Sequence, residues 1–327
     1  MGVEQRIDII RKIEENRGSR LLCCLTSDRE GMQGAIAKDF LYRFFLHLRK
    51  MKKLEKLDVL LFTLGGDTLA AYALSRLVRQ YAASIGVLVP HLCLSGGTLF
   101  ALGADEIVMT RLGTLSAIDP SINGPLNPIS EGAPQMGLPG QKPTIPVGVE
   151  SVAGFKKLVT EEWGLDNQGK SSAFSLLADK VNPILLGNLQ RSKEQIVRLA
   201  TSLMKLHVNP MDKKQIDLIV KTLASDLGSH DYMLVADEAR EEKLPVPKQN
   251  DVLEDLILRL YDDFAEEMEL GTPFNPMEGL GQQPMQPVTK VIKVVMIESL
   301  ERSDAWEREF VIVPPGQMQI RRNHWRR

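Results

Sequence analysis

The chain has few cysteines and almost no excess charge of either sign. Its 327 residues include three cysteines, Cys23, Cys24 and Cys93, at spacings that match no metal-binding pattern. Neighbouring cysteines rarely pair with each other, so we expect reduced thiols in the core of a cytoplasmic protein. The formal net charge of -2 excludes a strong overall attraction to nucleic acid or to a membrane surface. We therefore expect neither as a partner.

The sequence also lacks a long hydrophobic run. The charged N-terminal residues contain no apolar segment of the kind that a secretory signal peptide needs. Arg6 stands where a myristoylation signal has Ser or Thr. The longest nearly apolar stretch, 92–104, is too short to span a bilayer. Hydrophobic residues make up 43% and charged residues 25%, which is typical of a soluble globular protein that needs neither disulfides nor a structural metal.

Apolar strands alternate with amphipathic helices over the first third of the chain. The patterns predict strands at 20–25, 58–63, 85–94 and 106–110, and helices at 36–51, 68–81 and 98–104. The run DVLLFT at 58–63 is continuous and apolar, as in parallel strands that are covered on both faces. Strands and helices that alternate in this way predict a layered α/β fold.

The rest of the chain is less regular. Residues 123–146 carry many prolines and glycines and are expected to form a long loop, and a helical block follows from about residue 150. We expect a main domain over 1–250, a helix over 251–270 and a Pro/Gly-rich linker over 271–288. A small C-terminal β element would then occupy 289–327 and end in a frayed basic tail.

Two glycine turns form the candidate site. The strand at 58–63 runs into Gly65 and Gly66, and the next strand runs into Ser95, Gly96 and a helix. Glycine leaves room for a substrate to approach the backbone, and N–H groups at a helix start are unpaired. If the strands are neighbours, the amides of Gly66 and Gly96 converge on one carbonyl oxygen, which is an oxyanion hole beside a serine hydroxyl. Alternatively, both turns are structural and Ser95 is a helix N-cap.

The same two segments resemble a known family. The runs TLGGDTLAAYAL (63–74) and CLSGGTLFALGADEIVMTRLGTLSAIDPSI (93–122) are similar to the active-site segments of the Clp protease/crotonase superfamily, and most of all to the serine dehydrogenase proteinase family and signal peptide peptidase A. The run HDYMLVADEAREEKLPV (230–246) resembles the family's last strand and helix, although Lys243 stands where the family has glycine. The resemblance covers about residues 20–250.

The resemblance implies a fold and a reaction. The fold would be of the Clp/crotonase type, with stacked β-β-α turns and a protruding helical region. Ser95 would be the nucleophile of a serine-type peptidase that forms an acyl-enzyme and needs no cofactor, and the amides of Gly66 and Gly96 would form the oxyanion hole. Relatives of this fold enclose their sites in assemblies. The many apolar residues of 183–206 also predict a homo-oligomer.

Several residues are candidates for the base that activates Ser95. Clp proteases have a histidine where this chain has Asp119, and their catalytic aspartate corresponds to Asp231, the neighbour of His230. We expect His230 with Asp231 to act as the base, although successive side chains of an extended segment point to opposite faces. Signal peptide peptidases use a lysine, for which the candidates are Lys142 and then Lys156 or Lys157.

The remaining histidines are poorer candidates for the base. His91 shares the face of a predicted strand with Ser95, but four strand residues separate them by about 13 Å. His47 lies within a predicted helix and His207 ends one, so we expect both to be structural.

Three rival functions fit single features of the sequence. An inactive or crotonase-like relative would keep the fold without peptidase activity. Residues 164–171 match the P-loop pattern G-x-x-x-x-G-K-[ST], although no strand is predicted before them and Asp166 would place a negative charge in the phosphate cradle. The tail 321–327 mixes arginines with Trp325, as single-strand nucleic-acid binders do.

Overall fold

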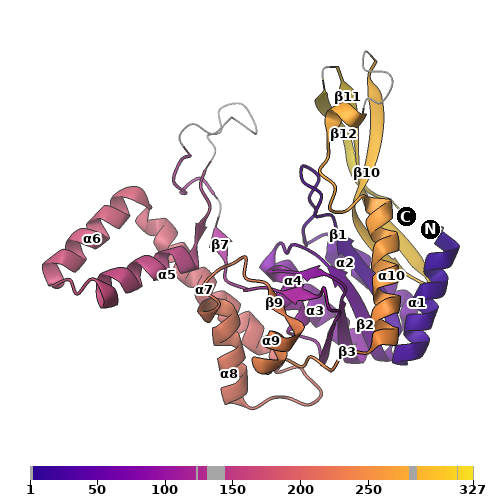
Figure 1. Ribbon diagram of the computed structural model, residues 1–327, viewed down its shortest axis with the longest axis horizontal. Helices are drawn as coiled ribbons and strands as arrows, with labels where there is room; N and C mark the ends of the chain where they lie inside the picture. The colour runs from indigo at the N-terminus through magenta and orange to yellow at the C-terminus, as the bar shows by residue number, and fades with distance from the viewer. Residues whose placement is uncertain (1–2, 123, 131–143, 280–285, 315, 327) are drawn as a thin grey trace. The chain divides into compact units, whose positions relative to one another are not determined.

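The computed structural model describes residues 3–122, 124–130, 144–279, 286–314 and 316–326 (Figure 1). Its internal contacts divide the chain into two compact units. The first unit comprises Met1–Ser116, Ser202–Ile219 and Met233–Arg327, and the second comprises Ala117–Thr201 and Val220–Tyr232. Each unit therefore combines segments that are distant in the sequence.

A mixed sheet forms the centre of the first unit, with the strand order β12-β11-β10-β1-β2-β3-β5 among the described residues. Four of its strands are parallel: β1 (Arg20–Thr26), β2 (Leu54–Phe62), β3 (Ala82–Val89) and β5 (Glu106–Met109). A smaller sheet contains β4 (Leu92–Cys93), β6 (Thr114–Leu115) and β9 (Leu234–Val235). The expected α/β fold is confirmed, but the predicted strand 85–94 is broken between β3 and β4.

Two helices from opposite ends of the chain lie side by side over one face of the sheet (Figure 1). They are α1 (Val3–Arg17) and α10 (Asp251–Met268). Ile10 of α1, Phe264 of α10 and Phe62 of β2 belong to one fully buried apolar cluster. Three more helices of this unit are α2 (Phe40–Met51), α3 (Thr68–Tyr81) and α4 (Gly96–Ala101). Helix α3 packs against both α2 and α4. A short α9 (Ala236–Glu241) follows β9.

The C-terminal strands belong to the main sheet. They are β10 (Val288–Ser299), β11 (Arg302–Val313) and β12 (Gln317–Arg326), and they follow the short helix α11 (Pro276–Gly279). β10 pairs antiparallel with β1, so that Cys23 lies opposite Glu298. The C-terminal β element thus contributes three strands to the main sheet of the chain itself. An open edge of β1 offers unpaired backbone N–H and C=O groups, and β10 satisfies them.

The basic tail is also ordered up to residue 326. It forms most of β12, whose partner is β11. The Trp325 ring lies 5.7 Å from that of Phe40, and its indole N–H donates to Asp39 Oδ2 at 2.7 Å. An aromatic contact and a charge-assisted hydrogen bond hold this exposed end of the chain, so the expected fraying is wrong.

The second unit is mainly helical, as the sequence predicts from residue 150. A short ladder of β7 (Ser121–Ile122) and β8 (Val147–Gly148) precedes the helices. The helices that follow are α5 (Val149–Lys157), the π-helix η1 (Leu158–Glu162), α6 (Asn167–Lys180), α7 (Pro183–Met204), α8 (Lys213–Lys221) and the π-helix η2 (Thr222–Asp226). The last residues of α7 and most of α8 belong to the first unit. Most of the predicted loop 123–146 lies outside the described residues. No described helix is both long and apolar enough to cross a membrane.

Candidate active site

Ser95 stands in a strained turn between β4 and α4. Its backbone has φ 50° and ψ -111°, which is uncommon for a residue with a side chain. Such strain costs about 1–3 kcal/mol and persists where surrounding contacts determine the conformation. The Ser95 N–H donates to Ser116 Oγ at 2.7 Å, and the Ser116 N–H donates to Thr98 Oγ1 at 3.0 Å. Thr98 Oγ1 in turn donates to the Cys93 carbonyl at 2.8 Å, so a chain of hydroxyls fixes the turn.

The Ser95 hydroxyl does not cap α4. Within the described chain, the Ser95 side chain makes no capping hydrogen bond to this helix. The residue is half-buried, so its hydroxyl is in reach of solvent. The N-cap reading of Ser95 is therefore wrong, and its side chain is left available for chemistry.

Gly66 stands at the first glycine turn with its peptide N–H directed away from the neighbouring chain. Ile36 pairs with it as in a parallel sheet, because the Ile36 N–H donates to Gly65 O at 2.8 Å and Ile36 O accepts from the Asp67 N–H at 2.9 Å. In parallel pairing these bonds use the residues on either side of Gly66, so its own N–H and C=O point to the opposite side. Gly66 is exposed, and its φ of +142° is a region that favours glycine.

The two turns are in contact. A Cβ added to Gly96 would lie 3.3 Å from Gly66 N, and one added to Gly65 would lie 2.8 Å from Ser95 Cβ. Among the described residues, neither the Gly66 nor the Gly96 N–H donates a backbone or side-chain hydrogen bond. Two amides that have no acceptor among the described residues therefore belong to two turns that are in contact, one of which holds Ser95.

His230 and Asp119 form an ion pair in the second unit. His230 Nδ1 lies 2.9 Å from Asp119 Oδ1, and the Asp119 side chain is 3% exposed against 38% for His230. The hydrogen bond to Asp119 raises the pKa of His230 above its ordinary value, although partial burial opposes this. With Nδ1–H donated to the carboxylate, the lone pair of the neutral ring is on Nε2.

The expected pairing of His230 with Asp231 is wrong. The two residues lie in a turn, where the Asp231 N–H donates to Ser229 Oγ at 3.2 Å, and the carboxylate that contacts His230 is that of Asp119. The sequence did contain a signal, because Asp119 occupies the position of the Clp histidine.

The lysine candidates lack a desolvated environment where they can be described. Lys156 and Lys157 are exposed on α5, and Lys157 Nζ lies 3.8 Å from Glu162. A lysine must be desolvated to lose its proton near neutrality, so neither fits a base. Lys142 lies outside the described residues.

The other histidines have structural partners. His47 is fully buried, its Nδ1 is 2.8 Å from Ser299 Oγ, and desolvation lowers its pKa to about 4. His207 Nε2 donates to the Leu102 carbonyl at 2.8 Å. Both are structural, as predicted. β3 ends at Val89, so His91 does not share a strand with Ser95, and its ring packs on Tyr261 instead.

The segment 164–171 is not a phosphate-binding loop. It follows the π-helix η1 rather than a strand, and the Asp166 side chain accepts a hydrogen bond from the Gly169 N–H at 2.7 Å. The carboxylate thus occupies the place that a phosphate would need, and the P-loop alternative is wrong. In the described part of the chain, no three His, Cys, Asp or Glu side chains are grouped to hold a metal ion, and the three cysteines are buried free thiols.

Two proteins of one archaeon are similar to this chain. Uncharacterized protein MJ0137 of Methanocaldococcus jannaschii is 26% identical over 247 residues, which is 74% of this chain and 73% of that protein. Uncharacterized protein MJ1495 of the same organism is 29% identical over 133 residues, which is 37% of this chain and less than half, 43%, of that protein.

A solved structure and a family model complete the comparisons. A serine-to-alanine mutant of the 1510-N membrane-bound stomatin-specific protease is 14% identical and aligns with a TM-score of 0.37 over 68% of this chain and 80% of that one. The model of the ClpP-like SDH-type serine proteinase family matches residues 2–131. This segment contains both glycine turns and Ser95. Residues 2–131 thus match the ClpP-like SDH-type serine proteinases, and the resemblance drawn from the two turns is confirmed.

Proposed function

We propose that this protein is a serine-type peptidase whose nucleophile is Ser95. The observation that carries the proposal is the contact between the two glycine turns, which leaves two unpaired amides beside a strained, uncapped serine. The Ser95 hydroxyl attacks the carbonyl carbon of a peptide bond, and the amides of Gly66 and Gly96 hold the oxyanion. Each such donor is worth about 3–4 kcal/mol of transition-state stabilisation.

His230 supplies the base in this proposal, and Asp119 orients it. Serine is a poor nucleophile until a base accepts its proton. His230 Nε2 takes the Ser95 proton and later gives it to the leaving amine, while the Asp119 carboxylate stabilises the imidazolium that forms. An acyl-enzyme results, and water releases it through the same base. Apart from the peptide and this water, each step uses groups of the chain, so the proposed reaction needs no cofactor.

The test is covalent labelling with a fluorophosphonate, followed by mapping of the labelled peptide by mass spectrometry. We expect label on Ser95, none in Ser95→Ala, and full labelling of Ser171→Ala, whose serine also lies near a glycine turn. Replacing His230 by alanine should slow labelling far more than replacing Lys142. Label on another serine with Ser95 untouched contradicts the proposal, and an unlabelled protein supports the inactive relative.

We further propose that the chain forms a homo-oligomer, but the reason differs from the one that the sequence suggested. Most of the apolar residues of 183–206 are buried in the chain itself and leave little free surface, among them Leu185, Leu189, Ile196, Leu199 and Leu203. Other large apolar side chains of the helical unit are exposed, among them Trp163 (55%), Phe174 (58%) and Leu176 (67%). Exposed apolar groups of this size favour association with a second copy. Analytical ultracentrifugation that gives the 36.5 kDa monomer at all micromolar concentrations contradicts this proposal.

A further inference from the structure

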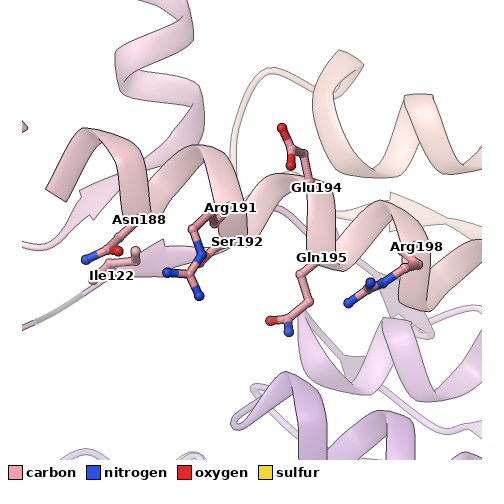
Figure 2. A pocket seen from close by; sticks show the side chains of 7 residues that line it. All are labelled: Ile122, Asn188, Arg191, Ser192, Glu194, Gln195 and Arg198. Atoms are coloured by element: carbon pink, nitrogen blue, oxygen red, sulfur yellow. The ribbon is translucent and has the colours of Figure 1, made fainter. Parts of the chain in front are cut away.

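A pocket of about 660 Å³ lies along α7 in the second unit (Figure 2). Its lining residues are Ile122 and six residues of α7: Asn188, Arg191, Ser192, Glu194, Gln195 and Arg198. Five of the six recur at helical spacing, so they form one polar stripe along the helix. The pocket is lined by long side chains that donate hydrogen bonds, and Ile122 adds an apolar wall.

The charge of this stripe is positive and uncompensated. Arg191 and Arg198 are exposed, and in the described part of the chain neither forms an ion pair. Lys193 on the same helix differs, because its ammonium lies 3.5 Å from Glu150. Glu194 also lines the pocket, but its carboxylate accepts from Gln190 Nε2 at 2.9 Å and is directed away from Arg191 in Figure 2. The pocket therefore presents two free guanidiniums.

The spacing of the two arginines specifies the ligand. Seven residues of α-helix separate them by about 10 Å along the axis, at 1.5 Å per residue. A peptide in the extended polyproline II conformation has three residues per turn, so side chains three residues apart lie on the same face, about 9 Å apart along its axis. Asn188 and Gln195 carry amides that can both donate to and accept from a peptide backbone. Among the described residues, the lining has no aromatic ring on which a nucleobase could stack.

We infer that this pocket binds an extended acidic peptide whose carboxylates are three residues apart. Each guanidinium forms a charge-assisted hydrogen bond with one carboxylate, and the amides between them hold the backbone. The inference concerns binding alone and does not depend on chemistry at Ser95, and it gives the helical unit a role separate from peptide cleavage.

The experiment measures binding of a fluorescein-labelled peptide with two glutamates three residues apart. The full-length Ser95→Ala variant is used, so that the peptide stays intact whether or not Ser95 is the nucleophile. We expect saturable binding by fluorescence anisotropy that weakens with added salt. Peptides with adjacent glutamates, or with lysines in their place, should bind at least about tenfold more weakly, since each loses a charge-assisted bond.

A matched pair of variants locates the binding. Arg191→Glu with Arg198→Glu should abolish binding, whereas Lys156→Glu with Lys180→Glu makes the same charge change on exposed residues outside the pocket and should leave it within about twofold. Equal losses in both variants would reduce the effect to overall charge and overturn the inference. Tighter binding of inorganic phosphate or of an oligonucleotide would also overturn it, as would a change of oligomeric state in the arginine variant alone.

Discussion

The Ser95 turn, which is in contact with the turn at Gly66, and the turn at residues 164–171 both precede helices but differ in the partners of their backbone amides. At the Ser95 turn, the strand β4 leads into α4, and the amides of Gly66 and Gly96 have no acceptor among the described residues. At the turn of residues 164–171, a π-helix leads into α6, and Asp166 accepts from the Gly169 N–H. The first turn keeps its N–H groups for a ligand, and the second satisfies them internally.

The difference shows what a glycine motif requires before it can bind an anion. Helix N-termini always start with unpaired N–H groups, so the motif alone carries little information. A capping carboxylate removes that capacity, whereas a strained serine without a cap preserves it. The state of the amides therefore separates the two turns better than the spacing of their glycines.

The largest difference between the two turns should appear when the serine of each is replaced by alanine. Ser95→Ala should lower turnover of a fluorogenic peptide by about 10⁴-fold or more, because the nucleophile is lost. Ser171→Ala should leave turnover unchanged, since its turn is closed by Asp166. If both variants lose activity equally, the distinction between the turns fails.

The next largest difference should be in the free energy of unfolding, when Gly66 beside the Ser95 turn or Gly164 of the other turn is replaced by alanine. A Cβ on Gly66 would lie 2.3 Å from the Ile36 carbonyl oxygen, so Gly66→Ala should destabilise the fold by about 2–5 kcal/mol. Gly164 has φ +59° with nothing within 4 Å, so Gly164→Ala should cost only about 1–2 kcal/mol of backbone strain. Urea denaturation measures both free energies of unfolding.

Substitution of Gly96 should affect peptide turnover more than the stability of the fold. A Cβ on Gly96 would stand 3.3 Å from Gly66 N and so would enter the space between the two amides. Gly96→Ala should therefore keep most of the stability and lose peptide turnover. Comparable costs for Gly66→Ala and Gly164→Ala, or full turnover in Gly96→Ala, would contradict this difference between the turns.

Local features of the site could be predicted from the sequence, whereas its distant contacts could not. The strand that ends at Gly65 and the turn at Ser95 follow from apolar runs and glycines within a few residues. The pair of His230 and Asp119 joins positions 111 apart in the chain, and β10 pairs with β1 across a still larger separation. No periodicity or spacing specifies such a partner. The sequence argued against the P-loop alternative through the missing strand, which is a local feature, and the structure then contradicted it.

The pH dependence of peptide turnover should show that Ser95 depends on a base that lies outside its own turn, namely His230. The pKa of His230 is raised by Asp119, so kcat/KM should rise with pH through an ionisation above 6.5, as the imidazolium loses its proton. Asp119→Asn removes the charge that favours the imidazolium, so the ionisation should move to lower pH. The plateau should fall by about 10²-fold because the ring is less well oriented.

Asp231→Asn is the matched control for this pH dependence. Asp231 acts on His230 through its charge and not through a hydrogen bond, so its variant should shift the ionisation less and keep the plateau. A larger shift in Asp231→Asn than in Asp119→Asn would return the pair to the one predicted from the sequence. An ionisation that neither variant moves would favour a lysine base.

The smallest effect concerns the acceptor that holds each turn. Ser116 Oγ accepts from the Ser95 N–H at 2.7 Å, so Ser116→Ala should relax the strained backbone and lower kcat about tenfold with little change in KM. Ser116→Thr keeps the hydroxyl and should recover most of that loss, which a purely structural role of Ser116 would not predict. Asp166→Ala removes the corresponding acceptor of the other turn, and should cost about 0.5–2 kcal/mol of stability without any effect on kcat. If Asp166→Ala slowed turnover as much as Ser116→Ala, both turns would act only through the stability of the fold, and the contrast between an open and a capped turn would lose its meaning for catalysis.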